Sequence, residues 1–377
     1  MTDSDSSLSA NEISDTEEPN GVEEKPISII WTLLDHVLTA LLITPLVVAY
    51  WWSTWDIIGV YVLPNNRELS GCLCLSFGLI INAVIFCSQH WLSLRARRSG
   101  CFLWITWHHL HTYIFSLSTI SLWRGLWVLL DVYTGRAPSV SFVQFSTSFI
   151  LLILLRSFTA AKSCPFKICN DLRSEGFRCS TRFTCKRKDG LALYLLDNLF
   201  TAWVLQLLVA TFWRSIWIFM DYLILPDDFR KAVSVMILGY ISTMCVYIFQ
   251  IPASRIYEHF DIRSRHWLFR VMADDFQHLV AHVTAVVLWW GWWFLFDMFL
   301  IRHDDIGHNY RLCLMSTSSI IILMLMATSN TVLFHQFDID GTPKSNCCPA
   351  IYYLKYTRYL IAYVSRKEAR FVQYERV

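Results

Sequence analysis

The chain has 377 residues, of which 55% are hydrophobic and only 16% are charged, and its formal net charge is +2. Soluble domains carry about 25% charged residues, so this composition excludes an ordinary soluble protein and predicts a membrane protein. The basic runs lie beside apolar segments, which gives no indication of nucleic-acid binding.

The chain begins with an acidic, Ser-rich stretch, residues 1–27, that contains no aromatic residue. Such a composition cannot bury enough apolar surface to fold, so we expect a disordered tail. No basic region precedes a short apolar core, and a cleavable signal peptide is therefore not expected.

Eight apolar segments of about 20 residues or more follow the tail, which is the length that a membrane-spanning helix requires. Period-2 alternation is absent from them, so we expect helices and not barrel strands. The predicted fold is an all-α membrane domain over 28–335 with eight transmembrane helices near 28–52, 71–94, 102–124, 140–160, 190–213, 231–251, 271–299 and 312–335.

Lys and Arg concentrate in the C-terminal tail and in the loops that follow the even-numbered segments. The positive-inside rule places such segments in the cytoplasm. We therefore expect a multi-pass protein of the plasma membrane, in contact with membrane lipids, with both termini cytoplasmic.

The pattern Trp-x3-Trp occurs four times, each time at the outer end of an odd-numbered segment, and three copies continue to x3-Asp. Positions i, i+4 and i+8 share one helix face. Two interpretations stay open: an interfacial aromatic belt in which the arginines reach lipid headgroups, or an outer vestibule whose Asp ring attracts cations. The motif residues are Trp51, Trp55, Trp123, Arg124, Trp127, Asp131, Trp213, Arg214, Trp217, Asp221, Trp289, Trp293 and Asp297, with Gly59 at the fourth Asp position.

Successive copies of the motif are 72, 90 and 76 residues apart, and the longest interval contains a Cys-rich basic loop, 161–189. Each unit comprises an odd helix, the motif, an outer loop and an even helix. The sequence therefore predicts four tandem two-helix repeats in one orientation, for which a pseudo-fourfold bundle is the natural packing.

Ionisable and amide side chains form a second layer about four helical turns before each Trp pair. Such residues inside a membrane are costly and normally face the bundle interior. Three interpretations stay open: buried hydrogen bonds that fix helix register, an ion or proton path, or a metal site at His108, His111, His278 and His282. The layer comprises Asp35, His36, His108, His109, His111, Asp197, Asn198, Asp274, Asp275, His278 and His282. Because the histidine spacing is not repeated, we expect no metal and no cofactor.

The cysteines of the basic loop, Cys164, Cys169, Cys179 and Cys185, are spaced too widely for the usual paired zinc ligands, so free or acylated thiols are favoured over zinc. Residues 336–377 are expected to form a cytosolic tail with an amphipathic segment on the inner leaflet. Cys347 and Cys348 beside it are candidates for palmitoylation.

The two motif copies at 123–131 (Trp-Arg-Gly-Leu-Trp-x3-Asp) and 213–221 (Trp-Arg-Ser-Ile-Trp-x3-Asp), together with eight segments and cytosolic termini, make residues 28–335 resemble the Fuseless family of invertebrate multi-pass membrane proteins. The resemblance implies a presynaptic protein needed for neurotransmission that organises calcium channels. We expect its channel or scaffold partners to contact loop 161–189 and the C-terminal tail.

No motif of a soluble catalytic site is present, and we expect a protein that is not an enzyme. Two alternatives remain. The first is an ion or proton channel or transporter that uses the Asp/His layer, and the second is a membrane metallo-oxidoreductase with histidine ligands.

Overall fold

The computed structural model describes residues 29–97, 100–169, 171, 177, 179–224, 229–259, 267–300, 307–334 and 340. Within these residues the chain is helical and contains no strand, which confirms the all-α prediction. The predicted N-terminal tail lies outside the described residues, and so does the C-terminal tail, with Cys347 and Cys348, apart from Asp340.

The described chain is a series of helices, with one long connection at 162–186. In chain order they are α1 (Ile29–Leu38), η1 (Thr39–Ile43), α2 (Thr44–Tyr61), α3 (Arg67–Arg97), α4 (Cys101–Tyr133), α5 (Pro138–Leu154), η2 (Phe158–Ala161), η3 (Arg187–Asp189), α6 (Leu191–Leu199), η4 (Phe200–Leu205), α7 (Gln206–Ile224), α8 (Phe229–His259), α9 (Trp267–Leu300), α10 (His308–Leu325) and η5 (Ser329–Val332). The pieces α1–η1–α2 and α6–η4–α7 each continue as one helix through a π-helical segment.

Six helical segments of the described chain are long and apolar enough to cross a membrane. They match six of the eight expected segments. The other two, expected at 140–160 and 312–335, are shorter: α5 has 17 residues and α10 has 18. Both helices stop before a non-glycine residue with positive φ, Arg156 (48°) or Ala327 (52°), and the chain then forms a 3-10 turn.

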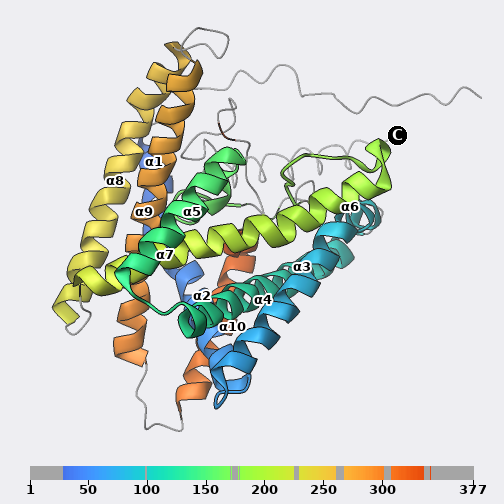
Figure 1. The fold of residues 1–377 in the computed structure, drawn as a ribbon, viewed down its shortest axis with the longest axis horizontal. Helices are drawn as coiled ribbons and strands as arrows, with labels where there is room; N and C mark the ends of the chain where they lie inside the picture. Colours follow the sequence, from blue (N-terminus) through green and yellow to red (C-terminus); the bar gives the residue numbers. More distant parts are fainter. Residues whose placement is uncertain are drawn as a thin grey trace, which may run out of the picture.

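Four helices, α2, α4, α7 and α9, form an inner ring in which each contacts the next and α9 returns to α2. Each inner helix has one main outer partner: α10 packs on α2, α3 on α4, α5 on α7 and α8 on α9. In Figure 1, α8 and α9 run side by side along one edge of the view and α3 and α4 along another, with α7 between the two pairs. The pairing of α10 with α2 brings the last long helix against the first.

Glycines allow two of these pairs to approach closely, as small residues do in membrane helix packing. A Cβ atom built on Gly125 of α4 would lie 2.3 Å from the backbone nitrogen of Leu75 in α3. On Gly291 of α9 it would lie 2.9 Å from Cα of Met236 in α8. Larger side chains at these two positions would force the helices apart.

The 3-10 turns η2 and η5 are each held by a carboxylate that accepts hydrogen bonds from the backbone of the turn. Backbone N–H groups of η2 at Phe158 and Thr159 donate to the carboxylate of Asp340, and those of η5 at Ser329 and Asn330 donate to Asp171. Each carboxylate therefore comes from the segment that follows the other turn. The backbone N–H of Asp340 donates in turn to Arg156 O, and that of Asp171 to Ala327 O.

We call the end of the bundle that contains these two turns the loop end. The opposite end, which contains Asp131, Asp221 and Asp297, is called the Asp end. The arrangement of the four inner helices sets the geometry of both.

Candidate functional site at the Asp end

The first tryptophans of the four motifs meet at the centre of the inner ring. Adjacent rings of Trp51, Trp123, Trp213 and Trp289 contact edge to face, with centroids 5.2, 5.8, 5.3 and 5.8 Å apart around the closed ring. None of the four is more than 3% exposed. Such T-shaped contacts are the preferred geometry of aromatic pairs. The indoles therefore face one another and do not form a belt against lipid.

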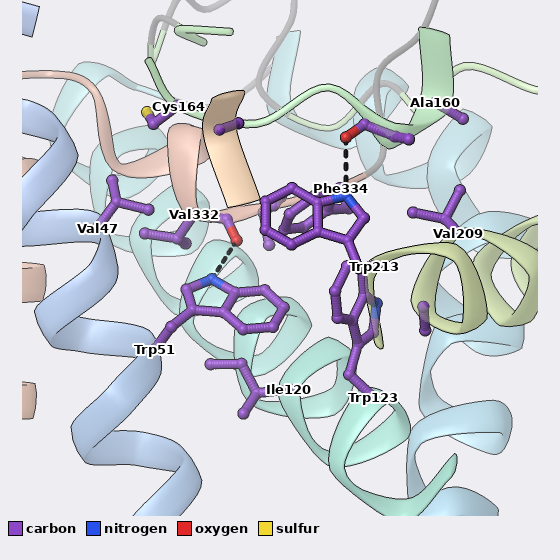
Figure 2. Packing of buried hydrophobic residues seen from close by; sticks show 14 of the residues in the cluster. Val47, Trp51, Ile120, Trp123, Ala160, Cys164, Val209, Trp213, Val332 and Phe334 are labelled. Atoms are coloured by element: carbon purple, nitrogen blue, oxygen red, sulfur yellow. Dashed lines mark hydrogen bonds between the residues drawn. The ribbon is translucent and has the colours of Figure 1, made fainter. Parts of the chain in front are cut away.

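Phe334, just after η5, contacts all four of these tryptophans at centroid distances of 4.6 to 6.3 Å. The indole N–H of Trp51 donates to Val332 O, and that of Trp213 to Ala161 O. Figure 2 shows both hydrogen bonds reaching the chain segments that enter from the loop end. These segments cover the tryptophan ring on that side.

One helical turn closer to the Asp end, the second tryptophans form another closed ring. Trp55, Trp127, Trp217 and Trp293 also contact edge to face, at 5.6, 5.9, 5.4 and 5.8 Å. The two rings and Phe334 thus fill the centre of the bundle with aromatic carbon over successive layers. The sequence predicted the shared helix face but not these contacts between neighbouring faces.

The Asp layer follows one turn later, and each carboxylate binds the side chain that comes directly after the first Trp of a neighbouring inner helix. Asp131 accepts a hydrogen bond from Arg214 (2.6 Å), Asp221 from the Trp290 indole (2.7 Å), and Asp297 from the Trp52 indole (2.7 Å).

Arg214 is fully buried and also donates to Gln144 and to Gly135 O. Of the two interpretations of the motif, the one in which Arg214 reaches lipid headgroups is therefore wrong. A buried guanidinium is stable only when its charge is compensated and its N–H groups are hydrogen-bonded, and Asp131 supplies the compensating charge.

The fourth corner differs because Gly59 replaces the carboxylate. The side chain that follows the first Trp there is Arg124, whose guanidinium donates to Ser70 Oγ (3.1 Å) and to Cys74 Sγ (3.6 Å). The cation at this corner thus contacts neutral groups where Arg214 contacts a carboxylate.

At the loop end, the predicted polar layer is largely buried and binds backbone groups. Asp197 accepts the N–H groups of Phe183 and Cys185, both at 2.9 Å. The neighbouring Asn198 accepts the amide of Gln89, whose oxygen in turn accepts the Cys179 N–H. These contacts attach the basic loop to the helices.

The equivalent residues of the first helix, Asp35 and His36, are also buried, and His36 packs edge-on against Tyr247 at 4.1 Å. In α9, the ring of His278 lies 2.8 Å from the backbone oxygen of Asp274, one turn earlier. Oδ1 of Asp275 has no hydrogen-bond partner among the described residues. The charges of Asp274, Asp340 and Arg156 also act on Asp275, so this part of the layer faces the segments at the loop end.

His108 contacts η5, because the Asn330 amide lies 3.1 Å from its Nε2, and Thr112 donates to the Asn330 oxygen. Ring nitrogens of His111 and His282 have no partner within the described part of the chain. His282 is fully buried and packs against Phe158 at 4.6 Å. These histidines are held mainly by aromatic packing.

One group of described residues, His108, His109 and Asp171, brings three candidate metal-ligand atoms within 4.8 Å of one another. Of the four histidines considered as ligands from the sequence, this group includes only His108. Asp171 already accepts three hydrogen bonds from η5, two from Ser329 and one from Asn330. Burial raises the pKa of the Asp171 carboxyl, and these donors act in the opposite direction. The geometry would admit a cation, while the donors identify Asp171 as a structural cap.

The basic loop is folded into the bundle over much of its described length. Cys164, Cys169 and Cys179 are buried, and the Cys164 carbonyl accepts the Trp289 indole N–H. Burial raises the pKa of Cys179, so its thiol is protonated at neutral pH. None of these cysteines belongs to the group of candidate metal ligands formed by His108, His109 and Asp171. The exposed part of the described loop is a short stretch that includes Phe183 and Lys186–Asp189.

Comparison with family models gives one match, to the Fuseless family, over residues 30–333. The chain belongs to the Fuseless family. No curated protein and no solved structure matches it. The matched region contains both Trp rings and nearly all of the expected domain 28–335, so the resemblance carried by the 123–131 and 213–221 motifs is confirmed.

Sequence reasoning missed two groups of residues in this Fuseless protein. The first is the pair Trp52 and Trp290, which supply indole donors to the Asp layer. A signal for them was present, since the residue after each first Trp is always Trp or Arg, both N–H donors. The second is the pair of capping carboxylates, Asp171 and Asp340, for which the sequence holds no repeated spacing.

Proposed function

We propose that this Fuseless protein supports synaptic transmission as a non-conducting membrane protein that organises or regulates presynaptic calcium channels. In this proposal the chain crosses the plasma membrane eight times, as four tandem two-helix units about a pseudo-fourfold axis, with both termini in the cytoplasm. The Asp end then faces the outside and the loop end faces the cytoplasm.

The observation that carries the non-conducting role is the filled centre of the bundle. An ion path needs polar groups or water along its length. The two tryptophan rings and Phe334 offer packed aromatic surface there. A protein with such a centre acts on neighbouring proteins more readily than it conducts ions.

The eight crossings are supported by how the two shorter helices pack. At about 1.5 Å per residue, α5 and α10 are about 26 Å long, close to the hydrocarbon thickness of about 30 Å. Each lies against a helical segment that is long and apolar enough to cross a membrane: α5 packs against α7, and α10 packs against α2. Polar residues at the start of α10 account for its lower hydropathy.

The exposed stretch Lys186–Asp189 is the part of the described loop best placed to contact partners. Arg187 and Lys188 are exposed and lie in the turn η3. Their charge suits an acidic segment of a channel or scaffold. The C-terminal tail remains the second proposed partner surface.

Coexpression with a presynaptic-type voltage-gated calcium channel tests the proposal through surface channel density and calcium current. We expect the wild-type protein to raise channel density. The double substitution Arg187→Glu, Lys188→Glu should lose this effect, and the charge-preserving control Arg187→Lys, Lys188→Arg should keep it. Unchanged channel density with wild type would contradict the organising role.

A proton-conducting role is the second candidate, and the buried histidines favour it. His282 is fully buried, and neither of its ring nitrogens has a hydrogen-bond partner in the described chain. Ionisable groups inside membranes usually mark functional paths, so this histidine is a candidate for carrying protons. Purified protein in liposomes with an imposed pH gradient separates the two candidates. The organising role predicts no proton flux, whereas conduction predicts flux that His282→Gln reduces.

A further inference from the structure

The fourth corner of the Asp layer contains a cavity of about 250 Å³ between α2, the start of α3 and α4. Its lining includes Trp55, Gly59, Arg67, Arg124, Trp127 and Arg136. This size admits a small molecule but is below that of most drug-sized ligand pockets. The cavity lies at the level of the Asp layer, which contains Asp131, Asp221 and Asp297 at the other three corners.

The cavity exists because one carboxylate is missing. At the other three corners an N–H donor meets an Asp side chain, but Gly59 carries none. A Cβ atom at Gly59 would lie 3.3 Å from a terminal nitrogen of Arg124. A side chain starting at that position would therefore meet the guanidinium directly, as the Asp131 side chain meets Arg214.

The charge balance of the cavity is positive. Three arginines line it with one carboxylate, Asp131, which is already bound at 2.6 Å by the buried Arg214 from outside the cavity. Arg67 and Arg136 each lie 3.8 Å from Asp131 as well, and Arg136 is paired with Asp221 at 2.7 Å. Arg124 has no ion pair with a described carboxylate, although Asp56 is near enough to interact with its charge. The free capacity for an anion is therefore at Arg124.

We propose that this cavity binds a small organic carboxylate, which takes the position of the missing aspartate. The carboxylate accepts charge-assisted hydrogen bonds from Arg124, for which the fork of guanidinium donors is well suited. Trp55 and Trp127 border the carbon skeleton, and the volume admits a ligand of about the size of a four-carbon dicarboxylate. The site is independent of the proposed action on channels.

Titration of the full-length protein in detergent with succinate tests the proposal, with binding followed by calorimetry and by the midpoint of thermal unfolding. Sodium chloride at equal ionic strength is the reference, and inorganic phosphate and acetate are the comparison anions. We expect saturable succinate binding to the wild type and a rise in its unfolding midpoint.

Two substitutions remove the site in opposite ways. Arg124→Gln removes the cation and should weaken succinate binding at least tenfold. Gly59→Asp supplies the carboxylate from the chain itself, so it should abolish binding while raising the unfolding midpoint without ligand. Because the nearest atoms to the new Cβ belong to the flexible end of Arg124, this variant should fold even if Arg124→Gln does not.

Gly59→Asn controls for filling the cavity without adding charge. It should block binding but should not reproduce the rise in unfolding midpoint. The proposal is overturned if the wild type does not bind succinate, or if Gly59→Asp binds it as the wild type does. Tighter binding of phosphate than of succinate would overturn the choice of a carboxylate. Phosphate binding that disappears in anionic-lipid nanodiscs would then identify a lipid headgroup as the occupant.

Discussion

The two ends of the bundle in this Fuseless protein use carboxylates differently. At the Asp end, Asp131, Asp221 and Asp297 bind side chains of neighbouring inner helices. At the loop end, Asp171 and Asp340 bind backbone N–H groups of 3-10 turns. The carboxylates of the Asp end connect helix to helix, and Asp171 and Asp340 attach the turns that cover the first tryptophan ring on its loop-end side.

This contrast indicates which kinds of contact a sequence repeat can specify. The Asp-end contacts use the same two positions of the motif in each unit, so one short pattern generates three of them. The loop-end contacts join residues more than 150 positions apart, and their partners belong to irregular segments. Substitutions at different corners of the Asp end should therefore reduce stability by separate amounts. Substitutions of the two caps at the loop end should reduce it by similar amounts.

The largest loss in the free energy of unfolding is expected from Asp131→Asn, because this substitution leaves the buried Arg214 without its counter-charge. Removing one partner of a buried ion pair costs about 3–5 kcal/mol. Asp221→Asn is the matched control, since an Asn oxygen can still accept the Trp290 indole and the lost pair with Arg136 is half exposed. The free energy of unfolding, from denaturant titration in detergent, gives both values. Equal losses in the two variants would contradict the special status of Arg214.

A smaller effect, about 1–3 kcal/mol, is expected from Asp171→Asn and from Asp340→Asn, because each leaves a buried backbone donor poorly satisfied. The matching geometry of the two caps predicts losses of similar size. Asp189→Asn is the control, since Asp189 caps the exposed turn η3 and its loss should cost less.

Similar losses of stability at the two buried caps would support equivalent roles for Asp171 and Asp340. A loss at Asp171 alone would instead indicate that its additional neighbours, His108 and His109, matter more than its capping role. Adding zinc to the wild type and to Asp171→Asn separates these cases, because only a metal site would show zinc-dependent stabilisation that the variant lacks.

The sequence predicted the helical membrane fold, the family and the shared faces of the Trp and Asp positions, because composition and i, i+4, i+8 spacing act within single helices. It did not predict the turns after α5 and α10. The residues that follow these helices include Phe158, Val332 and Phe334, whose apolar character continues that of the helix. The positive-φ residues that end the helices are Arg156 and Ala327, not the glycines that usually mark such ends.

The smallest expected effect is a difference in the free energy of unfolding between two substitutions in the first tryptophan ring. Trp51→Phe removes ring volume and also the hydrogen bond to Val332 O, whereas Trp123→Phe removes ring volume alone, since its indole N–H has no partner among the described residues. A buried hydrogen bond contributes about 1 kcal/mol, so Trp51→Phe should be the more destabilising by about that amount. The difference between the two unfolding free energies measures how strongly η5 is attached to the ring. If Trp123→Phe costs as much as Trp51→Phe, the Trp51 hydrogen bond adds nothing to the packing of the ring, and η5 is held by its carboxylate cap without help from Trp51.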